Sequence, residues 1–121
     1  MRRLLMGVVL SCVVLGSGAA DNNGTSQFWG TRTCGKYLSD VQQGNVESLF
    51  DAGWVAGFIT AYNIMAPDTY DIIGNSDMQS VTLFIRNYCK ANSLKNVDDA
   101  MQPLIEQLLP KRHRSQKEAG R

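Results

Sequence analysis

The chain has few of the residues from which most enzymes build their active sites. Its 121 residues include one histidine, His113, which lies in a polar C-terminal segment. The sequence contains no phosphate-binding glycine loop and no Cys/His group with metal-ligand spacing. A pair of carboxylates could occur in almost any sequence, so it carries no argument for catalysis. We therefore expect a protein that is not an enzyme, with no catalytic residues, metal or cofactor.

Long apolar runs are also absent beyond the N-terminus. There, Arg2 and Arg3 precede an apolar stretch over residues 4–15 and the small residues GSGAA. This layout predicts a cleavable signal peptide over residues 1–20 and a periplasmic protein. The stretch is shorter than the roughly 20 residues of a membrane span, and we expect no membrane contact. Lipidation at Cys12 is the alternative, but the bulky Leu10 two residues upstream favours a cysteine that is discarded with the leader.

Cysteine is scarce, and only Cys34 and Cys89 remain after the leader is removed. A pair of cysteines in a small exported domain predicts a disulfide bond. A reactive thiol would need a nearby base, and a metal site would need more ligands than the chain offers. We therefore interpret both cysteines as structural.

Acidic and basic residues are unevenly distributed. Residues 21–110 contain ten acidic and five basic side chains, whereas residues 111–121 contain five basic and one acidic. The acidic domain lacks the basic face that nucleic-acid binding requires, so we expect no nucleic-acid partner. The basic tail, 111–121, is expected to be disordered, or else to touch the domain's own acidic face or an anionic surface.

Apolar residues at helical spacing predict four helices and no strand. The first follows Thr33 and ends at Gly44, and the second runs from an N-cap at Asn45 to Met65. The second helix is expected to bury the apolar stripe Val46, Leu49, Phe50, Trp54, Gly57, Phe58, Ala61, Tyr62 and Met65. Its glycines, Gly53 and Gly57, suggest that another backbone packs closely against this helix. We expect that backbone to belong to the domain core, and a contact across an oligomer interface is the alternative.

The second half of the chain predicts two further helices. A capping box of Ser76 and Gln79 starts the third, over residues 77–92. The fourth begins after Asn96 and is expected to be interrupted near residues 99–102 by Pro103. The fold class is all-α: a small four-helix domain with a kinked last helix and one disulfide, over residues 31–110. A flexible N-terminal arm, residues 21–30, precedes it.

Two short segments resemble a known family. "TCGKYL" at 33–38 and "YCKANSLKN" at 88–96, with the tryptophan helix around Trp54, are similar to the HdeA/HdeB group of periplasmic acid-stress chaperones. The resemblance covers roughly residues 31–109. It implies a helical fold with a disulfide at Cys34 and Cys89, often a homodimer near neutral pH, which loosens in acid and holds unfolding client proteins soluble. The stretch "VAGFITAYN" is equally similar to periplasmic immunity proteins, which block secreted cell-wall-degrading effectors of type VI secretion.

Two functions therefore remain open, and each names its own surface. An acid-activated chaperone would offer apolar helix residues, namely Trp54, Phe58, Phe84 and Leu104, to unfolded clients when carboxylates lose their charge. An immunity protein would use a preformed surface against one specific effector protein. The loop with Asp68, Tyr70 and Asp71 is the candidate for that surface, because aromatic and charged residues anchor many interfaces.

Overall fold

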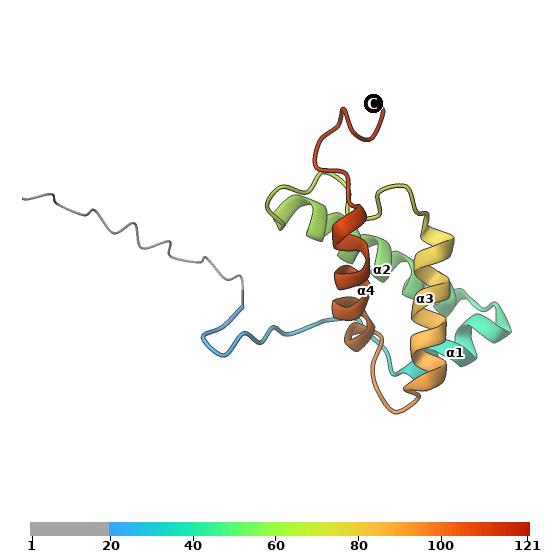
Figure 1. The fold of residues 1–121 in the computed structure, drawn as a ribbon. Helices are drawn as coiled ribbons and strands as arrows, with labels where there is room; N and C mark the ends of the chain where they lie inside the picture. Colours follow the sequence, from blue (N-terminus) through green and yellow to red (C-terminus); the bar gives the residue numbers. More distant parts are fainter. Residues whose placement is uncertain (1–19) are drawn as a thin grey trace, which may run out of the picture.

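The protein is a small all-α domain, as predicted. The computed structural model describes residues 20–121, so the predicted signal peptide, except Ala20, lies outside the described residues. Four α-helices and two short 3-10 helices follow one another along the chain (Figure 1). They are α1 (Cys34–Gln43), α2 (Val46–Met65), α3 (Met78–Ala91), η1 (Asp98–Ala100), α4 (Met101–Leu108) and η2 (Leu109–Lys111).

Short polar residues and one glycine set the ends of the first three helices. The side chains of Thr33 and Asn45 accept the backbone N–H groups of α1 and α2 at 3.3 and 3.2 Å. Gly44 ends α1 in the left-handed conformation, with φ of 61°. The predicted Ser76 cap of α3 is wrong by one residue, because the carboxylate of Asp77 accepts the Ser80 N–H at 2.7 Å and starts the helix there.

The predicted interruption of the last helix is confirmed. The chain first makes the 3-10 turn η1, and the α-helical pattern begins at Met101. Pro103 therefore lies in the first turn of α4 rather than in a helix interior. Backbone N–H groups have no partner within the helix there, so the missing donor of proline costs little.

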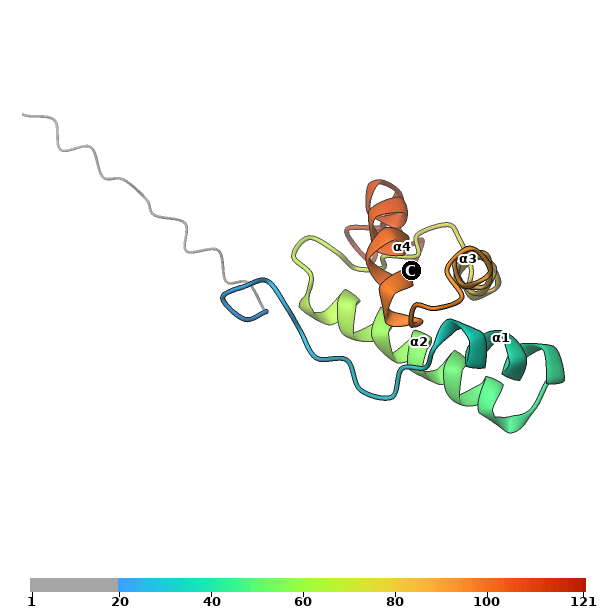
Figure 2. The same ribbon diagram turned by 90° about the horizontal axis from the view of Figure 1, so that it is seen from below.

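The four α-helices form two pairs, α1 with α2 and α3 with α4, and one core lies between the pairs. α1 and α2 form a helical hairpin around Gly44 (Figure 2), and α3 and α4 stand beside each other across α2 (Figure 1). The interior is filled by apolar side chains from all four helices and from the loops, namely Tyr37, Val55, Ile59, Ile72, Val81, Ile85, Val97, Ala100, Met101, Leu104 and Leu108.

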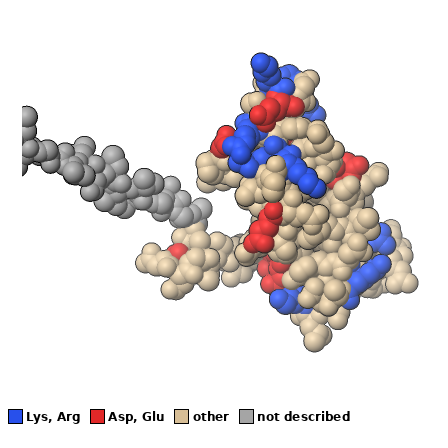
Figure 3. Space-filling model, in the orientation of Figure 1, with Lys and Arg blue, Asp and Glu red and all other residues tan. Residues whose placement is uncertain are grey.

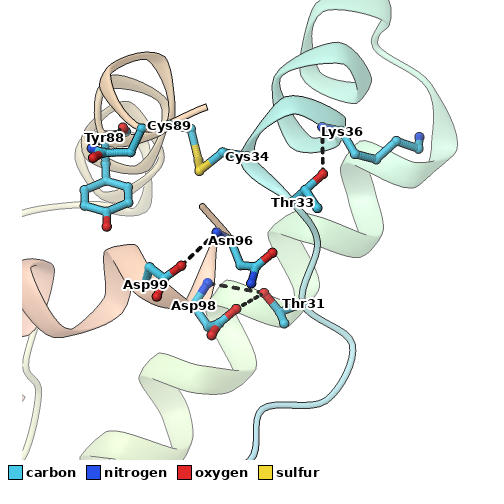
Figure 4. The surroundings of a disulfide bond; sticks show 10 residues. Thr31, Thr33, Cys34, Lys36, Tyr88, Cys89, Asn96, Asp98 and Asp99 are labelled. Atoms are coloured by element: carbon cyan, nitrogen blue, oxygen red, sulfur yellow. Dashed lines mark hydrogen bonds between the residues drawn. A yellow bond between two sulfur atoms is a disulfide. The ribbon is translucent and has the colours of Figure 1, made fainter. Parts of the chain in front are cut away.

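The predicted disulfide is present and joins α1 to α3. Cys34 and Cys89 are both fully buried, and their sulfurs are 2.09 Å apart (Figure 4). A short antiparallel bridge lies beside it: the Cys34 N–H donates to the Lys95 carbonyl at 2.8 Å, and the Val97 N–H to the Arg32 carbonyl at 2.8 Å. The two sequence segments that carried the family resemblance therefore meet at one end of the domain.

The first residues of the basic tail are attached to the domain, so the disorder expected over 111–121 is wrong there and the alternative, contact with the domain's own acidic face, is what the structure shows. The His113 carbonyl accepts the Tyr70 and Asp71 N–H groups at 2.9 and 3.0 Å, and the His113 N–H donates to the Asp71 carbonyl at 2.9 Å. Arg112 and Arg114 form ion pairs with Asp68. The physical reason is charge complementarity, because the tail meets an acidic loop, and the Lys and Arg side chains gather at this end of the molecule (Figure 3).

Candidate protein-binding surface

Helix α2 exposes a row of large apolar side chains. Val46, Leu49, Phe50, Ile64 and Met65 are between 64% and 75% exposed. The prediction that α2 buries Val46, Leu49, Phe50 and Met65 is wrong, since the buried positions of this helix are Asp51, Val55 and Ile59. The sequence could not distinguish the two faces because both are largely apolar, and the buried one contains the charged residue.

One end of this row forms an open, apolar groove. It has a volume of about 590 Å³ and is lined by Gly30, Val46, Leu49, Phe50, Gly53 and Trp54. Single exposed apolar residues are common on protein surfaces, but contiguous apolar patches mark interaction sites. The groove can therefore accept an apolar side chain or helix from another protein.

Two of the predicted binding residues, Trp54 and Phe58, form an aromatic cluster next to the groove. Phe28 completes the cluster: its ring stacks on Phe58 at a centroid distance of 6.1 Å and is tilted against Trp54 at 6.3 Å. The Trp54 indole N–H donates to the Trp29 carbonyl at 2.6 Å, and Gly30 permits this close approach because a Cβ there would lie 3.2 Å from the indole ring. The predicted flexible arm, 21–30, is therefore fixed to α2 at its last residues, while the Trp29 side chain stays 83% exposed.

The other two predicted client-binding residues belong to the interior. Leu104 is 2% exposed, and Phe84 is half-buried against the core. The folded domain therefore does not present Leu104, and an opened state would be needed to bring it to a client.

The loop between α2 and α3 presents the remaining predicted residues on a rigid base. Ile72 is fully buried, and its N–H donates to the Asn63 side chain at 2.8 Å. Gly74 lies so close to the tail that a Cβ would be 2.2 Å from the Lys111 carbonyl oxygen. Asp68 and Tyr70 are exposed and Asp71 is half-buried, so the loop and the tail form one continuous surface.

Two buried carboxylates on the α1–α2 hairpin are further functional candidates, and Asp40 is the one that sequence reasoning did not reveal. Asp40 is fully buried and Asp51 is 5% exposed. The Arg32 guanidinium lies between them, with Nε 3.0 Å from Asp51 Oδ1 and Nη1 3.7 Å from Asp40 Oδ2. Lys36 and Asn45 also donate hydrogen bonds to Asp40. One oxygen of each carboxylate, Oδ2, has no hydrogen-bond partner among the described residues.

The pKa values of the two carboxylates are shifted in opposite directions. Hydrogen bonds from Lys36 and Asn45 lower the pKa of Asp40 from its ordinary value of 3.8. Burial raises the pKa of Asp51, although the nearby Arg32 charge opposes that effect. As the pH falls, Asp51 is therefore protonated before Asp40.

Residues 20–121 contain no group of three or more His, Cys, Asp or Glu side chains placed to hold a metal ion. Within the same residues, no helix has the length and apolar character to cross a membrane. Comparisons of the chain with protein-family models, with curated proteins and with solved structures found no match.

Proposed function

We propose that the protein is a non-enzymatic periplasmic domain that binds other proteins, and that it acts as an acid-activated chaperone for unfolding clients. The observation that carries this proposal is the exposed apolar row on α2, with its groove beside Trp54. Unfolded clients expose apolar segments, and burial of apolar surface drives such association without sequence specificity.

The lowered pKa of Asp40 supports an acid trigger, whereas the raised pKa of Asp51 acts in the opposite sense, because protonation of Asp51 is favoured in the folded domain. Because the pKa of Asp40 is lowered, its contribution to folding is present above about pH 3.8 and is lost as the pH falls through its folded-state pKa. Below that pKa the partly buried Arg32 and the half-exposed Lys36 lose Asp40 as a negative partner. This loss weakens the contact between α1 and α2 and loosens the aromatic cluster on α2.

A client-aggregation assay tests the proposal. The oxidised protein should suppress aggregation of an acid-unfolded client at about pH 2.5, where carboxylates of ordinary pKa are protonated, and much less at pH 7. Phe50→Ser should weaken suppression several-fold, because Phe50 is 73% exposed on the groove. Leu83→Ser is the matched control, since Leu83 is 56% exposed on α3, away from the groove. Equal activity of the two variants, or no suppression in acid, would refute the chaperone.

The anchored loop favours a second candidate, an inhibitor of one secreted effector enzyme. Tyr70 is 39% exposed on a loop whose backbone is held by His113 and Asn63, and a preformed loop suits recognition of a single enzyme cleft. Bacteria that export the protein should then survive a secreted cell-wall hydrolase. Tyr70→Ala should remove that protection and leave acid chaperoning unchanged. Full protection by the Tyr70→Ala protein would exclude this loop as the inhibitory element.

A further inference from the structure

Helices α1 and α3 border a groove on the surface of the domain. The groove has a volume of about 320 Å³ and is lined by Leu38, Val41, Gln42, Arg86 and Lys90. A second hollow of about 350 Å³ follows α3 and is lined by Met78, Gln79, Thr82, Leu83 and Arg86. Because Arg86 lines both, the two hollows meet at this residue. We call these lining residues the α1–α3 face, and none of them belongs to α2.

The α1–α3 face carries two basic side chains that have no acidic partner within residues 20–121. Arg86 and Lys90 are both exposed, and neither takes part in an ion pair with a residue of that range. Helix α3 contains no Asp or Glu, the only acidic residue of α1 is the fully buried Asp40, and Asp77 is engaged as the N-cap of α3. Lys and Arg side chains are visible at the lower right of Figure 3, where α1 and α3 lie. The face is therefore basic on a domain that is acidic overall.

The spacing of the two basic residues brings no benefit to the isolated domain. Arg86 and Lys90 are four positions apart, so they are neighbours on one side of α3. Like charges at this spacing repel each other and oppose helix formation. A carboxylate placed between them would remove the repulsion. The guanidinium of Arg86 could hold that carboxylate through two parallel hydrogen bonds, which would give the contact a defined geometry.

Apolar side chains accompany the two cations. Leu83 is 56% exposed and Met78 is 36% exposed, while Leu38 and Val41 are half-buried in the wall of the groove. From Met78 to Lys90 the face extends about 18 Å, or roughly three helical turns. A helix of about 12 residues with an apolar row flanked by Asp or Glu matches the face in length, polarity and charge. We propose that the α1–α3 face binds an acidic amphipathic helix of a partner protein.

The small number of cations favours a protein partner over other anionic surfaces. Anionic membranes are recognised by clusters of about four to eight Lys and Arg side chains, whereas this face offers only Arg86 and Lys90. Nucleic acids likewise require a larger basic patch or stripe. A hollow bordered by two helices suits a third helix, whose apolar row would enter it while its carboxylates contact the rim.

This proposal goes beyond the proposed function, because it concerns a second surface on other helices. Binding to the α1–α3 face is measured at pH 7 without a client. The aggregation assay and the binding assay therefore succeed or fail independently of each other.

A nuclear magnetic resonance titration of the isotope-labelled, oxidised protein tests the proposal. The probe is a synthetic helical peptide of about 12 residues with a leucine row flanked by glutamates, and a comparison peptide carries lysines in place of the glutamates. The acidic peptide should shift the amide signals of residues 38–42 and 78–90 with a Kd of about 0.1–1 mM, and the basic peptide should bind there at least about 10-fold more weakly. Raising NaCl from about 0.05 M to about 0.5 M should weaken binding of the acidic peptide.

Charge reversal provides the second comparison. In the Arg86→Glu/Lys90→Glu protein the preference should invert, so that the basic peptide becomes the tighter ligand. Lys95→Glu/Lys117→Glu is the matched control, because it changes the charge equally at two exposed residues outside the face, and it should keep the preference for the acidic peptide. Circular dichroism shows whether both variants keep their helices.

Several results would overturn the proposal. They are equal binding of the two peptides to the natural protein, no shift at all, shifts confined to α2, or a control that loses the preference as completely as the charge-reversed face does. Shifts of the same residues by anionic phospholipid vesicles but not by the peptide, or by a rise in the protein's own concentration, would identify another occupant and would also overturn it.

Discussion

Loss of the Cys34–Cys89 disulfide should remove much of the stability of this domain. The two cysteines are 55 positions apart, so the bond closes more than half of the folded chain into a ring. By the chain-entropy relation, a ring of this size restricts the unfolded state by about 4 kcal/mol. A domain of about 100 residues has a total unfolding free energy of roughly 5–15 kcal/mol. The bond therefore accounts for a large share of it.

The assay is urea unfolding of the oxidised protein, the reduced protein and the Cys34→Ala/Cys89→Ala double variant. With an m-value of roughly 1–2 kcal/mol per molar, the midpoint should fall by about 2–4 M urea when the bond is absent. The reduced protein separates the constraint on the unfolded chain from the packing of the buried side chains, since its thiols still fill the buried space. The difference between reduced protein and double variant then measures packing alone.

The reasoning fails if the reduced protein unfolds within about 1 kcal/mol of the oxidised one at an unchanged m-value. Such a result would mean that the unfolded chain already keeps α1 and α3 close together without the bond. In acid the same comparison addresses function, because the reduced chain should open further and aggregate with its client.

Three further perturbations follow from the structure. Asp40→Asn should lower the unfolding free energy at pH 7, because the pKa of Asp40 is lowered in the folded state. The same variant should lose less unfolding free energy than the natural protein as the pH falls below about 3.8. Asp51→Asn should lower the unfolding free energy at pH 7 by a smaller amount, since burial raises the pKa at that site. Ile72→Ala should lower the unfolding free energy by about 2–5 kcal/mol, since the side chain is fully buried. A chain that stops after Lys111 should exchange the Tyr70 amide hydrogen faster, because that amide loses the His113 carbonyl.

Each perturbation has a control within the chain. If the unfolding free energies of the two Asp variants changed with pH in the same way from about pH 7 to pH 2, the opposite pKa shifts of Asp40 and Asp51 would be contradicted. Leu94→Ala is the control for Ile72→Ala and should change the unfolding free energy by less than about 0.5 kcal/mol, because Leu94 is 99% exposed. If Ile72→Ala lowered the unfolding free energy by no more than Leu94→Ala does, the role of Ile72 in the core would be contradicted. In the shortened chain the Cys34 amide, bonded to Lys95, should exchange as before, so faster exchange at both sites would indicate general destabilisation.

Local signals were sufficient to place the helices. Thr33, Gly44 and Asn45 act on neighbouring backbone groups, so their roles as caps are visible in the sequence itself. Pro103 likewise interrupts the helical pattern for a local reason. The disulfide was predictable because only two cysteines lie outside the predicted leader, which leaves a single pairing.

The orientation of α2 was not predictable from the same signals. Apolar and small residues surround this helix, so spacing alone does not show which side meets the core. Asp51 lies on the buried side, paired with Arg32 from the segment before α1, and a charged residue in a pattern normally indicates the solvent side. The correct face depends on a partner 19 positions away in the sequence, which periodicity does not reveal.

The attachment of the tail was also a long-range effect. Arg112 and Arg114 pair with Asp68 across more than 40 residues, and a basic run by itself is typical of a solvated segment. The left-handed backbone of Asp68, with φ of 52°, turns the loop toward these arginines. The charge count offered contact with the acidic domain only as an alternative to a disordered tail, and it did not identify Asp68 as the partner.

The disulfide divides the chain into a ring and two segments outside it. Residues 34–89 form the ring, which holds α1, α2 and all of α3 except its last two residues, whereas α4 and the tail follow it. The tail returns to the ring, because the His113 N–H donates to the Asp71 carbonyl. The segment that carries α4 therefore forms a second loop, which is closed by hydrogen bonds instead of a covalent bond. If that second loop opened, the disulfide would still hold α1, α2 and α3 together.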